Sequence, residues 1–523
     1  MTEAADRLFT NAEAHSLTTP DEVYEAIAVR DGEIVRLDSE YEIAFLEGVE
    51  TEVIDCEGRV VLPGFVDAHT HVENAGRFLV HADLTGADGS EECIDRLAAR
   101  ADETDAEWIQ GFGYDESEWD DADRGYLTRE HLDRVSVDRP VVALRIDMHA
   151  ASLNSVALER LVDDLPDADV RRDDATGEPT GVVVEDAAER VRERIAPGYD
   201  ETRELVTAGL EHAVRKGVTA VHDMVRNSRS PRVYRDLDAA GELPTRIRIN
   251  YWTDHADEVI EVGLATNAGS ERVQTGAIKT YTDGSIGART AKLSEPYDGA
   301  GSSSETVPDD GEWVVTPDEL EEIVERADDA GFQVTAHAIG DEAIEEALSA
   351  LEATTDPAGS RHRIEHVELA TDDHIARMAD AGIVASMQPN FHQWAGEGGL
   401  YEQRLGSDRR DRTNRFRRIL EAGVPLAFGS DCMPLDPLFG VRHAVNAPTE
   451  AQRLSVTEAL RAYTRGAAYA GFDERRLGTL EVGTKADLVV LEESPWAAAD
   501  RIDEIDVTMT VVDGSVVYDG RDE

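Results

Sequence analysis

Two histidines separated by one residue, His69 and His71, give the first indication of chemistry in this sequence. They lie at the end of an apolar, strand-like run. Side chains alternate between the two faces of a strand, so both imidazoles project from the same face. Two imidazoles on one strand can bind a single divalent cation. A pair of hydrogen-bonded core histidines is the alternative interpretation of the same pattern.

Residues of metal-ligand type also end three later strand-like runs. They are His337 in the fifth run, His366 in the sixth and Asp431 in the eighth. Each residue alone is a weak indication, because histidines in apolar runs are usually core residues and Gly-Ser-Asp is often a turn. Together with the histidine pair they place nitrogen and oxygen ligands at the same end of four strands. The sequence therefore predicts a divalent metal site.

Lys279 lies in a fourth apolar run, and its position there is unusual. Buried lysine is costly unless it is paired or chemically altered. Solubility does not explain it, since the chain has only four lysines and its other basic residues are arginines. Arginine cannot replace lysine where a neutral amine is required. A buried ion pair between Lys279 and a carboxylate is the alternative.

Eight strand-like runs alternate with helical stretches, and they must position these residues. Such alternation is typical of α/β proteins, and eight units predict a (β/α)8 TIM barrel, whose active sites lie at the carboxyl ends of the strands. The predicted strands are 60–71, 218–224, 246–252, 276–283, 332–338, 362–367, 382–388 and 424–431.

Both ends of the chain carry short alternating strands around turn residues. Residues 25–38 and 51–65 turn at Asp31-Gly32 and Glu57-Gly58, and residues 478–494 and 507–520 show the same pattern. Neither end alone has enough strands for a stable sheet, so we expect one small β-sandwich domain built from both termini. The predicted domains are a β-sandwich from 1–63 and 478–523, and a barrel over 64–477 with an inserted subdomain at about 72–200.

The charge of the chain excludes several classes of function. Asp and Glu number 110 against 51 Lys and Arg, a formal net charge of -59. Such a chain repels phosphates and anionic membrane surfaces, so we expect no nucleic-acid partner and no membrane partner. Excess carboxylate with scarce lysine resembles proteins from cells that keep molar salt inside, where surface repulsion is screened. We therefore expect a halophilic protein.

The three cysteines are scattered and predict no disulfide framework. The start of the chain lacks the basic and apolar stretches of a signal peptide, and no run approaches the ~20 apolar residues of a membrane span. We expect a cytoplasmic protein that acts on a small molecule. A homodimer is one of the oligomeric states that the sequence leaves open.

Seven motifs extend nearly from end to end of the chain: LPGFVDAHTH (62–71), GEPTGVVVEDA (177–187), IKTYTDGSIGARTAKLSEPY (278–297), TAHAIGDEAI (335–344), RIEHVEL (363–369), FGSDCMPLDPL (428–438) and LGTLEVGTKADLVVL (477–491). They resemble the amidohydrolase superfamily, and within it the amidohydrolase-3 branch of YtcJ-like metal-dependent hydrolases. The sequence is also similar to N-substituted formamide deformylases.

The resemblance implies a centre of two divalent ions. His69 and His71 would bind the more buried ion, and His337 and His366 the outer ion. Histidine and carboxylate ligands suit zinc, and also manganese, iron, cobalt or nickel.

The resemblance also implies the roles of the remaining two ligands. Lys279, converted by carbon dioxide to a carbamate, would bridge both ions, and Asp431 would bind the inner ion and move the proton. Two divalent ions lower the pKa of a bridging water towards about 7, so that hydroxide can attack a carbonyl. Asp431 would then deliver the proton to the leaving nitrogen. The implied reaction is hydrolysis of a non-peptide C–N bond in an amide, formamide or cyclic amide.

Three further residues are candidates for substrate binding. His149 resembles a substrate-facing histidine of this branch, Arg289 follows a Gly-rich segment, and His222 ends the second predicted strand. Two other functions stay open. A mononuclear aminohydrolase that deaminates a heterocycle would carry a catalytic Glu near His337, where this chain has Ala-Ile-Gly-Asp. The other is a non-catalytic regulatory relative. Such a protein would be free to lose its metal ligands, whereas this chain keeps a complete set.

Overall fold

The computed structural model describes residues 3–120, 124–173, 175–299 and 308–521. The chain divides into two compact units, one formed by Met1–His71 with Leu210–Glu523 and the other by Val72–Gly209. The candidate metal ligands predicted from the sequence all belong to the first unit.

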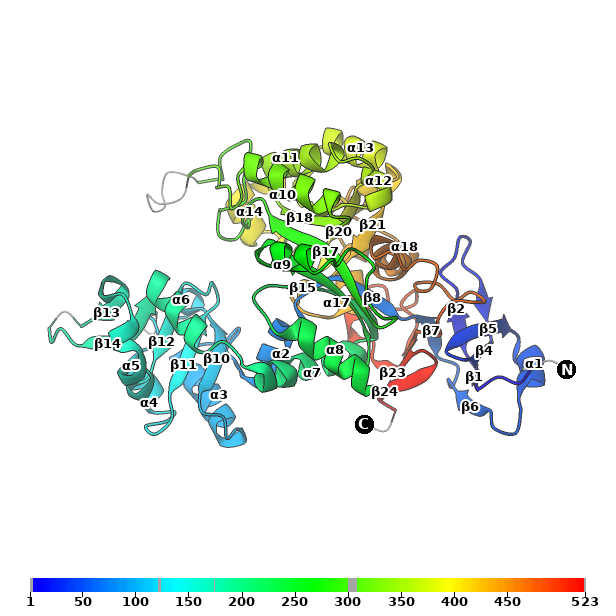
Figure 1. Cartoon of the computed structure of the whole chain (residues 1–523), viewed down its shortest axis with the longest axis horizontal. Helices are drawn as coiled ribbons and strands as arrows, with labels where there is room; N and C mark the ends of the chain where they lie inside the picture. Colours follow the sequence, from blue (N-terminus) through cyan, green and yellow to red (C-terminus); the bar gives the residue numbers. More distant parts are fainter. Residues whose placement is uncertain (1–2, 121–123, 174, 300–307, 522–523) are drawn as a thin grey trace. The chain divides into compact units, whose positions relative to one another are not determined.

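The first unit contains an eight-stranded sheet in which every pair of neighbouring strands is parallel (Figure 1). Its strands are β8 (Phe65–Thr70), β15 (Val218–Val225), β16 (Arg246–Trp252), β17 (Val273–Tyr281), β18 (Val334–Ala338), β19 (Arg363–His366), β20 (Val384–Met387) and β21 (Leu426–Phe428). The spatial order follows the chain order. Beyond the two edge strands, the backbone N–H of Asp431 donates to His69 O at 2.7 Å. The predicted TIM barrel is confirmed.

Helices follow the barrel strands and cover the sheet with apolar faces. In α10 (Pro317–Asp329), Leu320, Val324 and Ala327 are buried at helical spacing, and the start is stabilised by Pro317 and a capping box between Thr316 and Glu319. The other helices of this unit are α1 (Glu40–Ile43), α8 (Ser230–Ala240), α9 (Ala256–Glu261), α11 (Asp341–Glu352), α12 (Pro357–Ser360), α13 (Asp372–Ala381), α14 (Leu400–Leu405), α15 (Ser407–Arg410), α16 (Phe416–Glu421), α17 (Pro437–Val445), α18 (Val456–Arg461) and α19 (Ala467–Ala470).

The first predicted strand, 60–71, is two strands in the structure, so that prediction is wrong in detail. The chain breaks at Gly64 between β7 (Val60–Pro63) and β8. A Cβ atom on Gly64 would lie 2.3 Å from Thr219 Cγ2, so only glycine permits this close approach. β7 pairs with strands of the terminal domain, and β8 opens the barrel.

The terminal domain is the predicted β-sandwich from both ends of the chain. One sheet holds β1 (Arg7–Thr10), β4 (Ala26–Arg30), β5 (Glu33–Asp38) and β6 (Glu52–Asp55). The other holds β2 (Glu13–His15), β3 (Val23–Tyr24), β7, β22 (Leu488–Leu491), β23 (Val507–Val512) and β24 (Ser515–Asp519). Their inner faces share one core, which includes Phe9, Ile27, Val61, Leu488 and Met509.

The predicted turn residues of this domain are confirmed where they join paired strands. Asp31 and Gly32 have φ of 53° and 76°, as a tight hairpin between β4 and β5 requires. The strands around Glu57-Gly58 differ, because β6 and β7 enter different sheets instead of pairing with each other.

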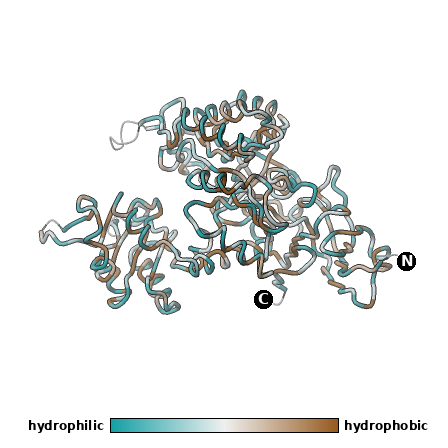
Figure 2. Tube along the Cα trace, in the orientation of Figure 1, coloured by the Kyte–Doolittle hydropathy of each residue, from teal (hydrophilic) through white to brown (hydrophobic). Residues whose placement is uncertain are grey.

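The second unit is a six-stranded sheet with an apolar core on each face. Its strands, in spatial order, are β13 (Val170–Arg172), β14 (Pro179–Val184), β12 (Ala150–Leu153), β11 (Val141–Arg145), β10 (Ile109–Tyr114) and β9 (Ala82–Asp83). Its helices are α2 (Val72–Val80), α3 (Ser90–Glu103), α4 (Arg129–Asp133), α5 (Ser155–Leu161) and α6 (Glu185–Arg194), and α7 (Tyr199–Arg215) leads back to the barrel. Hydrophobic and hydrophilic positions alternate along the chain in both units (Figure 2).

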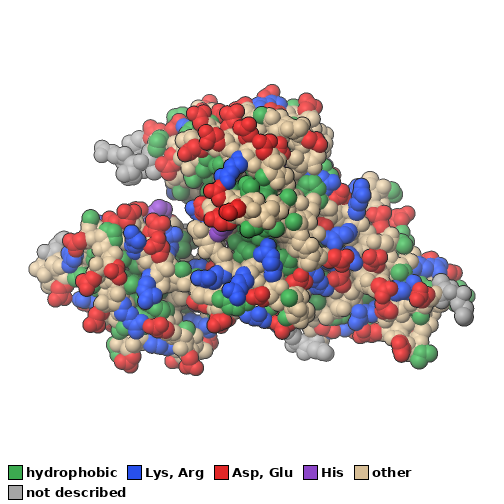
Figure 3. Space-filling view, in the orientation of Figure 1, with side chains coloured by type: hydrophobic (Ala, Val, Ile, Leu, Met, Phe, Trp, Pro, Cys, Tyr) green, Lys and Arg blue, Asp and Glu red, His purple; other side chains and the backbone are tan. Residues whose placement is uncertain are grey.

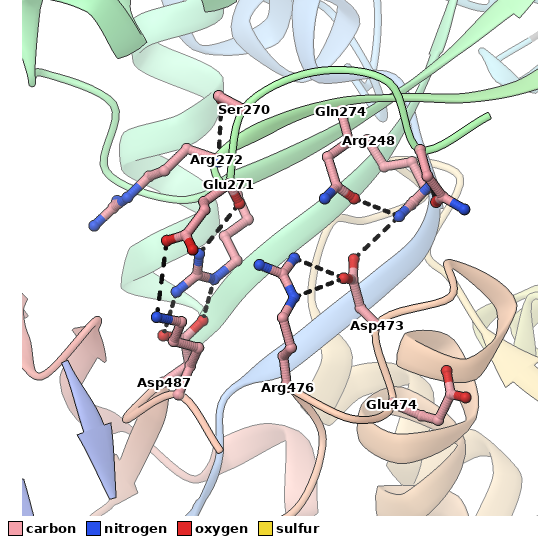
Figure 4. A network of polar contacts seen from close by, with 12 residues as sticks. Arg248, Ser270, Glu271, Arg272, Gln274, Asp473, Glu474, Arg476 and Asp487 are labelled. Atoms are coloured by element: carbon pink, nitrogen blue, oxygen red, sulfur yellow. Dashed lines mark hydrogen bonds and ion pairs between the residues drawn. The ribbon is translucent and has the colours of Figure 1, made fainter. Parts of the chain in front are cut away.

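Ion pairs tie the amino-terminal ends of the barrel strands to the last part of the chain. Arg248 and Arg476 both reach the carboxylate of Asp473, at 3.2 and 2.6 Å (Figure 4). Arg246, at the start of β16, pairs with Asp487 at 2.7 Å. Arg246, Arg248, Asp473 and Arg476 border a shallow recess at this end of the barrel. The recess therefore lies at the strand ends opposite to those that carry the candidate metal ligands.

Acidic side chains cover much of the face shown over α10, α11 and α13 (Figure 3). In the part of the chain that the structure describes, no helix is both long enough and apolar enough to span a membrane.

Candidate metal centre

The ends of β8 and β21 bring His69, His71 and Asp431 together. The three residues offer ligand atoms that all lie within 4.8 Å of one another, as a bound metal ion requires. Asp431 Oδ1 lies 3.1 Å from His71 Nε2 and 3.5 Å from His69 Nε2. The two strand-end histidines therefore share one carboxylate.

His337 and His366 extend this group into a row of imidazoles. The ring centres of His69 and His366 lie 5.1 Å apart, and those of His366 and His337 lie 4.4 Å apart. We call His69, His71, His337 and His366 the histidine cluster. The structure thus brings together the four histidines that the sequence analysis selected as metal ligands.

The outer nitrogens of three of these histidines have hydrogen-bond acceptors. His69 Nδ1 lies 2.6 Å from a carboxylate oxygen of Glu365, and His71 Nδ1 lies 3.0 Å from Met224 O. His337 Nε2 lies 3.0 Å from Gly284 O. Carbonyl and carboxylate oxygens accept, so these nitrogens carry the proton and donate it. In His69 and His337 the other nitrogen therefore keeps its lone pair for a metal ion. Burial would lower the pKa of His71, but the contact of its Nε2 with Asp431 outweighs burial and raises the pKa.

Glu365 is the strongest of these acceptors, and the sequence analysis missed it. It is fully buried, and its second oxygen pairs with Arg363 at 2.7 Å and accepts from Thr335. Burial alone would raise the pKa of Glu365, but Arg363 and His69 outweigh it and hold the pKa well below its usual range. A period-two signal was available, because Arg363 and Glu365 are two residues apart and therefore share one face of β19.

The charge states of His337, His366 and Asp431 suit a divalent cation. Burial lowers the pKa of His337 to about 3 and that of His366 well below its usual value. Both rings are therefore neutral at pH 7. Burial would raise the pKa of Asp431, but His69 and His71 outweigh it and lower the pKa. Neutral imidazoles and an ionised carboxylate are the ligand forms that divalent metals bind.

Lys279 is buried beside the cluster without a hydrogen-bond partner. Its side chain is 1% exposed, and within the described residues no group bonds its Nζ. The Nζ lies 5.6 Å from the ring centre of Trp252 and 6.0 Å from that of Tyr281. Burial lowers the pKa of Lys279 to about 8. The alternative of a direct ion pair with a carboxylate is thus not realised among the described residues.

The backbone at the two ligand-bearing turns is unusual. His366 and Val367 have φ of 73° and 53°, and Asp431 and Cys432 have φ of 52° and 59°. Non-glycine residues adopt this region only at a cost of about 1–3 kcal/mol, which the surrounding structure must offset. Cys432 stabilises the second turn, since its Sγ accepts from His71 N at 3.2 Å. It is a packing residue at this turn.

The three residues predicted to bind substrate lie in different surroundings. His222 Nδ1 accepts from Arg363 at 3.1 Å, and the ring borders the recess at the opposite strand ends. The structure therefore places His222 behind Arg363 and outside the histidine cluster. Arg289 donates to Asp298 O at 3.0 Å. His149 belongs to the second unit, where it bonds Glu185 at 3.1 Å. Substrate binding by these three residues stays a prediction.

Comparison with known proteins identifies the family of this chain. Residues 52–518 match the sequence profile of the Amidohydro_3 group, described as the amidohydrolase family. The chain is 31% identical to YtcJ of Bacillus subtilis over 95% of this chain and 96% of that protein. It is 26% identical to an N-substituted formamide deformylase of Arthrobacter pascens over 99% of both chains.

A solved structure agrees as well. The crystal structure of a metal-dependent hydrolase from Pyrococcus furiosus matches with a TM-score of 0.79 and 29% identity, and the match covers 94% of this chain and 99% of that one.

Proposed function

Because this chain belongs to the amidohydrolase family and has the fold of a metal-dependent hydrolase, we propose that it hydrolyses a non-peptide C–N bond in an amide, formamide or cyclic amide. The observation that carries the proposal is the meeting of His69, His71 and Asp431 within 4.8 Å at the carboxyl ends of the barrel strands. The formamide deformylase among the similar proteins supports a C–N bond as the target.

The donor set fits two divalent ions, with zinc as the first choice. His69, His71 and Asp431 would hold one ion, and His337 and His366 would hold the second. Lys279 would join the two as a carbamate formed with carbon dioxide. Its buried and unpartnered amine supports this role, because a buried cation without a partner is costly whereas a bridging anion is not. Divalent ions at such a site polarise a carbonyl and lower the pKa of water.

The residues of the chain would then hold the ligands and move one proton. Glu365 keeps the proton of His69 on Nδ1, and the carbonyl of Met224 does the same for His71. Asp431 would accept the proton of the attacking water on a carboxylate oxygen and pass it to the leaving nitrogen. Its lowered pKa keeps it ionised, which is the form that can accept a proton.

A mononuclear aminohydrolase is the second candidate function. The observation in its favour is that only one group of three ligand atoms in the described part of the chain is already within 4.8 Å. A mononuclear enzyme would bind one ion per chain and release ammonia from a heterocycle.

Metal analysis and a substrate panel test the proposal. Protein purified in high salt should hold two divalent ions per chain and hydrolyse a member of a panel of formamides, lactams and imides. His69→Ala and His71→Ala should lose metal and turnover, while His131→Ala, far along the sequence in α4, should keep both. One ion per chain with ammonia release would favour the aminohydrolase. Metal without any turnover would favour a non-catalytic relative.

A further inference from the structure

Gln388 is a buried carboxamide whose two polar atoms both lack a partner. It follows β20 directly and is 1% exposed. Within the described residues, neither its Oε1 nor its Nε2 has a hydrogen-bond partner. Buried polar groups are rarely left unpaired, because each unmade hydrogen bond carries a desolvation cost. A group that would satisfy both atoms must therefore have a donor and an acceptor.

The strand geometry sets the direction of this side chain. Ser386, two residues earlier, points into the barrel, where its Oγ accepts from Arg363 at 2.9 Å. Arg363 in turn pairs with Glu365, which holds His69. Side chains two residues apart on a strand share a face, so Gln388 projects to the same interior, one step nearer the carboxyl end. That is the end at which the histidine cluster lies.

The residues after Gln388 are fixed against the metal centre. The ring of Phe391 stacks on His366, with 5.8 Å between ring centres and 9° between planes. Asn390 donates to Ser430 O at 2.6 Å and to Met433 O at 2.7 Å, on both sides of Asp431. The segment that carries Gln388 therefore contacts both ligand-bearing turns.

We propose that the carboxamide of Gln388 binds the substrate, and that it selects a cyclic amide with a free N–H. This inference rests on the proposed function. In a lactam, cyclic imide or cyclic urea the ring forces the amide into the cis form, with N–H and C=O on one edge. A carboxamide matches that edge, because its Oε1 accepts from the N–H while its Nε2 donates to the C=O. An open-chain amide in the trans form can make only one of these bonds.

Aromatic side chains at the cluster suit a flat ring. Tyr281 contacts His337, with 5.0 Å between ring centres, and Phe391 contacts His366. Trp252 packs on Tyr281 at 4.4 Å, and Trp394 on Phe391 at 5.1 Å. Such rings bind planar apolar surface, so a small heterocycle can place its ring on them while its amide edge meets Gln388.

Binding measurements test the role of Gln388. Calorimetry on metal-loaded protein compares succinimide with N-methylsuccinimide, in which a methyl group replaces the N–H. The wild type should bind succinimide about tenfold or more tightly than the methylated imide. Gln388→Met, which keeps the length of the side chain, should bind both alike. Gln403→Leu is the matched control, since Gln403 is exposed on α14, and it should keep the wild-type preference.

Three outcomes would overturn the inference. In the first, the wild-type protein binds the two imides equally or binds neither. In the second, Gln388→Met keeps the wild-type preference. In the third, Gln388→Met loses metal, which would make Gln388 a metal ligand. Gln388→Glu gives a second variant that accepts but cannot donate, and it should also lose succinimide binding. Lack of C–N hydrolysis across the substrate panel would reject the proposed function instead, while the imide preference would still decide the role of Gln388.

Discussion

Glu365→Gln should weaken metal binding although Glu365 is not a metal ligand. The carboxylate accepts the Nδ1 proton of His69 at 2.6 Å, and this leaves Nε2 free to face Asp431. In the variant, the amide oxygen satisfies Arg363 and the amide nitrogen then faces Nδ1. Both groups would be donors, so His69 must move its proton to Nε2 or lose the hydrogen bond. Either change removes or weakens one ligand.

The size of the effect follows from these contacts. Loss of an outer partner of a metal-bound histidine typically costs 10–100-fold in metal affinity, about 1.4–2.7 kcal/mol. The variant also leaves Arg363 buried beside a neutral amide instead of a carboxylate at 2.7 Å. Breaking a buried ion pair costs about 3–5 kcal/mol. Because the amide oxygen of the variant still accepts from Arg363, we expect a loss of folding stability near the lower value.

Two measurements separate these effects. Competition with a chelator gives the metal dissociation constant, and urea unfolding of metal-free protein gives the free energy of unfolding. Glu345→Gln is a matched control, because Glu345 also pairs with a histidine and an arginine, His374 at 3.1 Å and Arg377 at 2.7 Å, but on the surface helices. The control should lose less than about 1 kcal/mol and bind metal normally. A Glu365→Gln variant with wild-type metal affinity would refute the reasoning.

Three further predictions concern the bridge, the salt response and one ion pair. Lys279→Ala should lose at least one metal ion and nearly all turnover, and Lys279→Arg should fail as well because a guanidinium cannot form a carbamate; two ions retained in Lys279→Ala would reject the bridge. The melting temperature should rise with potassium chloride, because salt shortens the range of repulsion in a chain of net charge -59, and a flat response would reject the halophilic interpretation. Burial would raise the pKa of Glu458, but Arg417 and Ser455 outweigh burial and lower the pKa to about 2. The contribution of the ionised Glu458 to folding stability is therefore present above the usual pKa of glutamate, and it is lost as the pH falls towards 2. Glu458→Gln should therefore lower stability by about 1 kcal/mol at pH 7 but leave it unchanged near pH 2, as measured by urea unfolding at both pH values.

The histidine cluster could be selected from sequence because residue type and strand position coincide there. His337 and His366 lie at the carboxyl ends of β18 and β19, and parallel strands bring such ends together. Glu365 could not be selected in the same way, because a glutamate next to a candidate ligand is equally typical of a strand end that is exposed to solvent. Its role depends on β19 and β8 facing each other across the barrel, which only the closed sheet provides.

The break at Gly64 shows a second limit of the sequence. Residues 60–71 contain a Pro63-Gly64 pair, which marks a turn, but the run alone does not show that β7 and β8 enter different sheets. At the break, Thr219, more than 150 residues later, fills the space that a side chain at position 64 would need. Close approach of distant segments is set by tertiary packing, so a single run of residues does not reveal it.

The three acceptors that orient the cluster differ in what a mutation can change. Met224 and Gly284 act through backbone carbonyls, which remain in place whatever side chain stands there. Glu365 acts through its side chain and depends in turn on Arg363. A carboxylate is also a stronger acceptor than a carbonyl and makes the histidine it contacts a more basic ligand. Sensitivity to substitution behind the metal ligands should therefore concentrate on β19, where one buried ion pair both fills the barrel interior and fixes the proton of His69.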